Sequence, residues 1–122
     1  MAKQFPGAGY DLVTFLDCLH DMGDPAGAAA HVRQSLKSDG TWMIVEPMAG
    51  LPARGQAEPC GTLYYAGSTM VCVPTSLSQE VGAALGAQAG KAKLPEVVTA
   101  GGFGNVRRAT ETPFNMVLEA RP

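Results

Sequence analysis

The stretch that decides the fold is residues 11–24, DLVTFLDCLHDMGD. It begins with Leu12–Leu16, an apolar run typical of a strand buried on both faces inside a parallel sheet. It then changes to a histidine, His20, among the carboxylates Asp17, Asp21 and Asp24. Such a change marks either a strand end that carries chemistry or an acidic loop before a helix.

The residues that follow predict a helix. Asp24 can cap its first turn, and Pro25 suits the first helical position because its missing N–H has no partner there. Apolar residues then recur at helical spacing, at Ala29, Val32 and Leu36. Gly40 is suited to the left-handed conformation that commonly ends a helix.

A second buried strand is predicted at Thr41–Val45, ending at Glu46 before a proline. Strand, helix and strand together form a βαβ unit, whose strands are parallel. Because the carboxyl ends of parallel strands meet at one edge of the sheet, where ligands bind in α/β folds, we expect Asp17, His20 and Glu46 to lie near one another.

The rest of the chain predicts further α/β elements. Two antiparallel strands are expected to form a hairpin at the end of the chain. The segment 62–73 is either a short helix followed by a strand or one helix lining a cleft. The expected elements are a loop at Met48–Gly61, a weak helix and loop at Ser76–Gly90, a helix at Leu94–Ala100, and strands at Phe103–Ala109 and Phe114–Ala120.

The totals exclude several classes of protein. The chain has 122 residues, which allows one domain or part of one, and 46% of them are hydrophobic, which is too apolar for disorder. A net charge of -2 and no basic run with aromatic residues argue against nucleic-acid binding. No apolar run could span a membrane, and the first residues do not resemble a secretory signal, so a cytoplasmic protein is predicted.

The cysteine pattern predicts reduced thiols. The chain has three cysteines, Cys18, Cys60 and Cys72, an odd number at long spacing. A metal site formed by Cys18, His20 and a distant cysteine is conceivable, but this C-x-H pair without a second paired motif lacks the spacing of zinc sites. No metal site is therefore predicted, and Cys18 is interpreted as a small buried residue that is not a nucleophile.

Three segments resemble class I S-adenosylmethionine-dependent methyltransferases. YDLVTFLDCLHDMGDP is similar to the fourth strand and "LHDW-x-D" loop of their O-methyltransferase branch. SLKSDGTWMIVEP is similar to the next helix end, turn and fifth strand, and TAGGFGNVRRATETPFNMVLEAR to the "aGF" turn and closing hairpin. The resemblance is strongest to actinobacterial and mycobacterial methyltransferase-like proteins. It implies the C-terminal half of a Rossmann-like sheet, with strands in the order 4-5-7-6.

The family's glycine-rich cofactor motif does not occur in the sequence. The GAGY at residues 7–10 precedes a strand instead of following one, so it lacks the context of a cofactor loop. Residues 1–122 are thus interpreted as a single partial methyltransferase domain without the N-terminal cofactor-binding half. The cofactor implied by the resemblance is S-adenosylmethionine.

The resemblance also implies roles for individual residues. His20 occupies the position of the family's general base, which removes the proton of the acceptor hydroxyl, and Glu46 is the carboxylate expected to orient it. Met22 stands where the family has a tryptophan against the acceptor. Leu16 and Asp17 occupy positions near the cofactor.

Alternative interpretations of these side chains stay open. His20 could instead bond to a backbone carbonyl, and Glu46 could be a solvated strand end. Tyr64, Tyr65 and Met70 line an acceptor pocket or, as the more common case, pack in the core. The family's other orienting carboxylate has only an amide near its position, Gln88.

The sequence leaves three hypotheses for function. The first is methyl transfer to a small-molecule hydroxyl by a chain that needs a complementing half. The second is a non-catalytic binding or assembly module, and the third is another doubly wound enzyme such as a reductase. Without a neighbouring strand, Asp11–Leu16 would be an exposed edge, so we expect a dimer or other homo-oligomer, or a complementing chain, at this edge.

Overall fold

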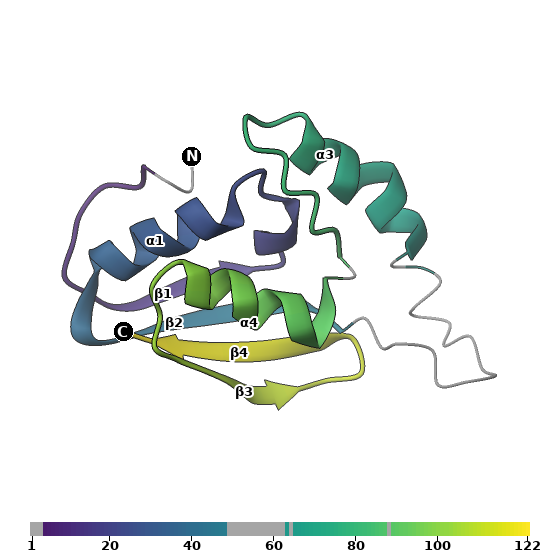
Figure 1. Ribbon diagram of the computed structural model, residues 1–122. Helices are drawn as coiled ribbons and strands as arrows, with labels where there is room; N and C mark the ends of the chain where they lie inside the picture. Colours follow the sequence, from purple (N-terminus) through teal and green to yellow (C-terminus); the bar gives the residue numbers. More distant parts are fainter. Residues whose placement is uncertain (1–3, 49–62, 64, 88) are drawn as a thin grey trace.

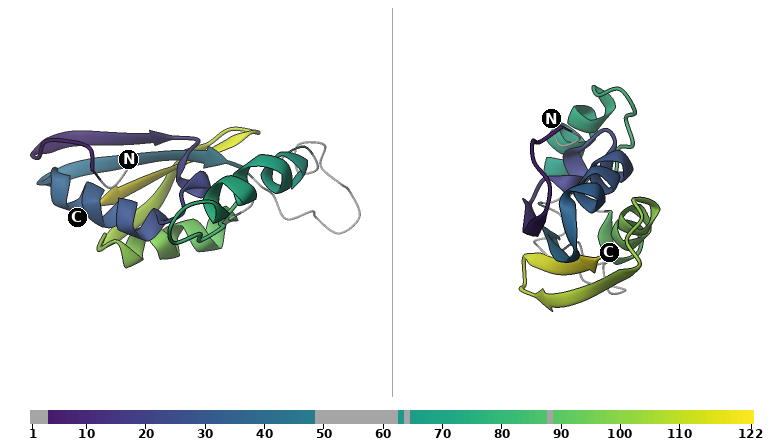
Figure 2. Two further views of the ribbon diagram at one scale, coloured as in Figure 1. Left: turned by 90° about the horizontal axis from the view of Figure 1, so that it is seen from above. Right: turned by 90° about the vertical axis from the view of Figure 1, so that its left-hand side faces the viewer.

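The computed structural model describes residues 4–48, 63, 65–87 and 89–122. It is an α/β fold with one four-stranded sheet, and the helices lie on one face of that sheet (Figures 1 and 2). The elements are β1 (Tyr10–Leu16), η1 (Leu19–Asp21), α1 (Pro25–Ser35), β2 (Leu36–Pro47), η2 (Ser68–Cys72), α3 (Val73–Leu77), α4 (Gly90–Ala100), β3 (Asn105–Glu111) and β4 (Asn115–Arg121). No helix within the described ranges is long and apolar enough to cross a membrane.

The strand order is β1-β2-β4-β3. The strands β1 and β2 are parallel and joined through α1, as a βαβ unit requires. β4 pairs antiparallel with both β2 and β3, so the last two strands form the predicted hairpin. This order corresponds to the expected 4-5-7-6 arrangement and confirms the predicted fold class.

The core lies between the sheet and the helices. Trp42 of β2 is fully buried, and its ring centroid lies 5.1 Å from that of Phe15 and 5.2 Å from that of Phe103. These three aromatic side chains join β1, β2 and the segment before β3. The other buried apolar residues are Leu19, Ala28, Ala29, Val32, Leu36, Ile44, Leu94, Val98, Met116, Leu118 and Ala120.

The predicted end of the first helix was wrong. α1 ends at Ser35, Leu36 is already extended, and Gly40 lies inside β2 without a positive φ. A Cβ atom at Gly40 would lie 2.8 Å from the carbonyl oxygen of Tyr10. The glycine therefore permits a close approach of β1 to β2 and is not a helix cap. The start of α1 was predicted correctly, because Asp24 Oδ1 accepts a 2.8 Å hydrogen bond from the Gly27 N–H.

Several boundaries also differ from the prediction. The described residues of the segment 62–73 are helical, so the alternative with a strand is wrong for them. The helix predicted at Leu94–Ala100 begins earlier, at Gly90, and both hairpin strands begin later than expected. Phe103 precedes β3 and packs in the core. The loop predicted at Met48–Gly61 lies almost entirely outside the described residues.

β1 lies at the edge of the sheet. Its predicted burial on both faces was wrong, because the helices cover only one face of the sheet (Figure 2). Phe15 faces the core, whereas Leu12 and Leu16 are 54% and 61% exposed on the face without helices. An apolar run does not reveal whether helices cover one face of a strand or both. Tyr65 and Met70 are also exposed, so the interpretation of these two as core residues was wrong.

Replacing Gly101 by alanine should lower the free energy of unfolding by about 1–3 kcal/mol, the usual range for overpacking. A Cβ atom there would lie 2.3 Å from Ala29 Cβ and 2.9 Å from Ala30 N, where α4 meets α1. Urea unfolding followed by far-UV circular dichroism measures the change. Gly104→Ala is the matched control, because a Cβ atom at Gly104 meets nothing within 4 Å. Equal midpoints for the two variants would contradict this interpretation.

Candidate active site

The carboxyl ends of β1 and β2 bring His20 and Glu46 together. His20 lies in η1, which directly follows β1, and Glu46 lies near the end of β2. His20 Nδ1 is 2.5 Å from Glu46 Oε2, and Glu46 Oε1 accepts a 2.8 Å hydrogen bond from the Leu19 N–H. Both side chains are buried. Glu46 is therefore not a solvated strand end, and His20 pairs with a carboxylate instead of a backbone carbonyl.

This contact fixes how the imidazole can act. An ionised carboxylate only accepts hydrogen bonds, so Nδ1 carries the hydrogen and Nε2 of the neutral ring presents a lone pair. Burial lowers the pKa of His20. The hydrogen bond and charge of Glu46, together with the charges of Asp21 and Asp17, raise this pKa by more than burial lowers it. The net result is a pKa above the ordinary 6.5, which favours the protonated ring.

The other ring nitrogen faces Asp21. His20 Nε2 lies 3.2 Å from Asp21 Oδ1, and this oxygen is buried without a hydrogen-bond partner among the described residues. Asp21 belongs to η1 and also lines a neighbouring pocket. His20 itself is not among the residues that line this pocket. It therefore contacts the pocket through Asp21.

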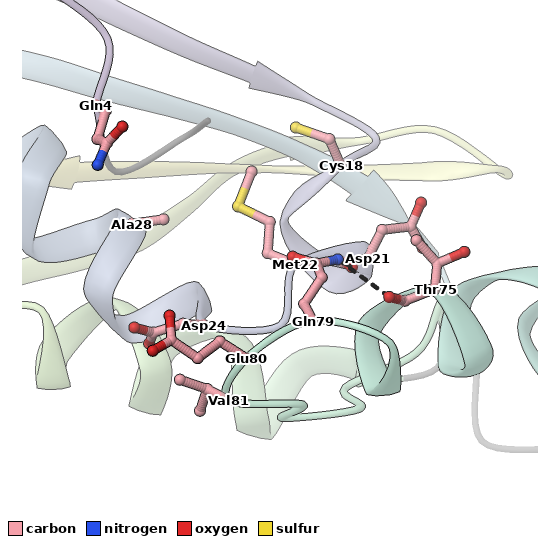
Figure 3. A pocket seen from close by; sticks show the side chains of 10 residues that line it. All are labelled: Gln4, Cys18, Asp21, Met22, Asp24, Ala28, Thr75, Gln79, Glu80 and Val81. Atoms are coloured by element: carbon pink, nitrogen blue, oxygen red, sulfur yellow. Dashed lines mark hydrogen bonds between the residues drawn. The ribbon is translucent and has the colours of Figure 1, made fainter.

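The pocket has a volume of about 570 Å³ and lies between η1, the start of α1 and the segment after α3 (Figure 3). Met22, which the resemblance places against the acceptor, lines it. Its other lining residues are Gln4, Cys18, Asp21, Asp24, Ala28, Thr75, Gln79, Glu80 and Val81. The lining is thus mixed, with apolar side chains beside carboxylates and amides.

Two polar residues that the sequence did not single out hold the pocket together. Gln79 donates a 2.9 Å hydrogen bond to the carbonyl of Asp21 and accepts one of 2.9 Å from the Gly23 N–H. The hydroxyl of Ser76, which is fully buried, donates a 2.9 Å bond to the carbonyl of Met22. These bonds tie α3 and the following segment to η1. No sequence pattern predicts them, because the partners are far apart in the chain.

The residues expected near the cofactor lie outside this pocket. Leu16 is 61% exposed at the carboxyl end of β1. Asp17 has a φ of 53°, and its N–H donates a 2.8 Å hydrogen bond to the carbonyl of Val45. The chain turns there from β1 into η1. Leu16 and Asp17 therefore form a surface beside the pocket, at the edge of the sheet.

The sequence singled out five other residues, Cys18, Tyr64, Tyr65, Met70 and Gln88. Cys18 is half-buried and lines the pocket, and its pKa is raised by burial and by the charge of Glu46, so its thiol stays protonated at neutral pH. Tyr65 and Met70 do not line the pocket. Tyr64 and Gln88 lie outside the described residues.

The chain matches solved structures of other proteins. No protein-family model and no curated protein sequence matches the chain. Solved structures do match it. PigF with SAH has a TM-score of 0.67 at 15% identity, with 99% of this chain aligned to 33% of that one. Human N-acetylserotonin methyltransferase in complex with SAM has a TM-score of 0.63 at 16% identity, with 99% aligned to 32%. An O-methyltransferase family protein from Burkholderia thailandensis has a TM-score of 0.62 at 20% identity, with 99% aligned to 33%.

The matches agree on the fold. The chain spans about a third of the length of each solved structure it matches. The aligned part is 99% of this chain, which includes the βαβ unit and the closing hairpin that the motifs predicted. The chain has the fold of the C-terminal part of a class I S-adenosylmethionine-dependent O-methyltransferase.

Proposed function

We propose that the chain forms the acceptor-side part of an enzyme that transfers a methyl group from S-adenosylmethionine to a hydroxyl of a small molecule. His20 is the general base in this proposal. The observation that carries it is the buried contact between His20 Nδ1 and Glu46 Oε2, beside a pocket at the carboxyl ends of parallel strands. A histidine oriented by a carboxylate is a common arrangement for proton removal.

The residues would act on the acceptor as follows. The acceptor binds in the pocket against Met22, and the Asp21 carboxylate, which is about a third exposed, moves away from His20 Nε2. Nε2 would then take the proton of the acceptor hydroxyl, so that its oxygen could bond to the methyl carbon while the carbon–sulfur bond breaks and S-adenosylhomocysteine leaves. Glu46 stabilises the imidazolium that results, because its carboxylate already bonds to Nδ1.

In this proposal, Leu16 and Asp17 form part of the cofactor surface. Leu16 offers an exposed apolar side chain at the end of β1, which fits the face of a purine ring, and the exposed Asp17 carboxylate can accept a hydrogen bond from a hydroxyl. When bound, the cofactor supplies an electrophilic methyl group on a sulfonium. Its remaining contacts would come from a complementing chain or a second copy that pairs with the open edge of β1.

Replacing His20 should abolish most of the methyl transfer. General-base catalysis contributes about 10²–10⁴-fold, so His20→Gln should lower kcat by about this factor. Its amide can still donate to Glu46, which preserves the fold, whereas His20→Ala also removes that bond. The measurement is transfer of labelled methyl from S-adenosylmethionine to phenolic acceptors, with S-adenosylhomocysteine binding followed by calorimetry.

His31 provides the matched control. It lies in α1, where its Nε2 is 3.0 Å from the carbonyl oxygen of Phe5, and His31→Gln should keep the wild-type rate. Wild-type turnover in His20→Gln would disprove the base. No S-adenosylhomocysteine binding at millimolar ligand by the folded chain would disprove the form of the proposal in which a second copy supplies the missing cofactor contacts.

A second candidate function is a non-catalytic assembly module. The observation that favours it is the open edge of β1, with Leu12 and Leu16 exposed on its uncovered face. An exposed apolar edge strand readily pairs with another chain. Light scattering on the same samples separates the two functions, because an assembly module forms oligomers without binding S-adenosylhomocysteine.

A further inference from the structure

We propose that His20, Asp21 and Cys72 form a binding site for a divalent cation of the zinc class. One ligand atom from each residue, the imidazole Nε2 or Nδ1, a carboxylate oxygen and Sγ, lies within 4.8 Å of the others. The three residues come from η1 and from the end of η2. Spacing in the sequence does not suggest this site, because the fold brings Cys72 to η1 from far along the chain.

The hydrogen bonds leave a gap that a cation would fill. Since Nδ1 of His20 donates to Glu46, Nε2 of the neutral ring is an acceptor, and it faces Asp21 Oδ1 at 3.2 Å. Two acceptor atoms at this distance need a hydrogen or a cation between them. The oxygen is buried and has no hydrogen-bond partner in the described part of the chain. Either a proton on Nε2 or a metal ion satisfies both atoms.

The distances suit a metal ion. Ligand atoms at about 2.0–2.3 Å from a tetrahedral zinc ion lie about 3.3–3.7 Å from one another. The Nε2 to Oδ1 distance is already close to this range, and the Cys72 sulfur lies within 4.8 Å of the ligand atoms of His20 and Asp21. A small movement of the Cys72 side chain would complete three ligands. Asp21 also lines the pocket, which has room for a water molecule as fourth ligand.

Glu46 supplies the outer contact that such sites need. Metal-binding histidines usually donate their other N–H to a carboxylate, which fixes the tautomer and makes the ligand nitrogen more basic. Glu46 makes this contact with His20 and is itself held by the Leu19 N–H. The mixture of nitrogen, oxygen and thiolate ligands favours zinc over magnesium or calcium, which prefer oxygen alone.

This site uses the nitrogen atom that the proposed function assigns to proton removal. A metal ion on His20 Nε2 therefore blocks the base, and binding of the ion would inhibit methyl transfer. Metal binding can be measured without cofactor or acceptor. The two proposals thus succeed or fail separately.

The test is titration of the reduced, chelator-treated chain with Co²⁺, followed by Zn²⁺. We expect one Co²⁺ per chain, a near-ultraviolet band from charge transfer between thiolate and cobalt, and loss of that band when zinc displaces cobalt. Cys72→Ser should remove the band, and circular dichroism confirms that the variant is folded. Glu46→Gln should weaken metal affinity about 10–100-fold, as for other residues that support a metal ligand.

The other cysteines provide the control. Cys18→Ser/Cys60→Ser leaves Cys72 as the only thiol and should keep the full band. A band that persists in Cys72→Ser or disappears in the double variant would assign the metal to another thiol and overturn the proposal. The absence of any band at stoichiometric cobalt would also overturn it.

Discussion

Replacing Glu46 by alanine should lower the free energy of unfolding by about 3–5 kcal/mol, the range for removing one partner of a buried ionic pair. Glu46 is 1% exposed, and both of its carboxylate oxygens are engaged, one with His20 Nδ1 and the other with the Leu19 N–H. Alanine leaves both donors buried without an acceptor. Urea unfolding in buffer with a chelator, followed by circular dichroism, measures the change.

Two control variants separate the effect of the Glu46 charge from the effect of its buried position. Glu46→Gln keeps the side-chain volume and an oxygen for Leu19, so it should cost less than alanine. Glu111→Ala removes a carboxylate whose pair with Arg108 is exposed, and should change stability by less than about 1 kcal/mol. A cost for Glu46→Ala as small as that for Glu111→Ala would mean that the buried pair contributes little to stability.

The same pair predicts how stability depends on pH. The pKa of His20 is raised in the folded chain, because Glu46 and the nearby carboxylates outweigh burial. The pair's contribution is therefore complete below the unfolded pKa of about 6.5 and is lost as pH rises through the folded value. Glu46→Gln removes the charge that mainly offsets the effect of burial on the pKa of His20. NMR titration should therefore show a lower pKa for His20 in this variant. An unchanged pKa would contradict this assignment.

The parts of the site that could be predicted from the sequence depend on local patterns. Asp24 caps α1 as its position before Pro25 indicates. His20 and Glu46 each follow an apolar strand, and the parallel pairing of those strands brings their ends together. Local sequence and topology were therefore sufficient for this contact.

Contacts across long stretches of chain could not be predicted. Ser76 reaches η1 from α3, Gln79 from the segment after α3, and Cys72 from η2. None of these residues belongs to a motif or a periodic pattern. Gly40 shows a different difficulty. A glycine after a helix can permit a left-handed turn or a close approach of strands, and only the pairing of β1 with β2 decides between them.

Replacing Trp42 by alanine should also lower the free energy of unfolding by about 3–5 kcal/mol, the usual range for removing a large buried aromatic side chain. Trp42 is fully buried in β2 between the rings of Phe15 and Phe103. Its loss opens a cavity where β1, β2 and the segment before β3 meet. Because Trp42 is the only tryptophan, far-UV circular dichroism replaces fluorescence in the urea titration.

Trp42→Phe and Tyr65→Ala make the cause of this loss testable. The indole Nε1 of Trp42 is buried without a hydrogen-bond partner among the described residues, so phenylalanine removes an unsatisfied donor together with part of the volume. Trp42→Phe should therefore cost much less than alanine. Tyr65 is 54% exposed, and its replacement by alanine should cost under about 0.5 kcal/mol. If Trp42→Ala unfolds at the same midpoint as Tyr65→Ala, the aromatic cluster does not hold the sheet together. The support for the His20–Glu46 contact would then have to come from the pairing of β1 with β2 and from the hydrogen bonds of Ser76 and Gln79 next to η1.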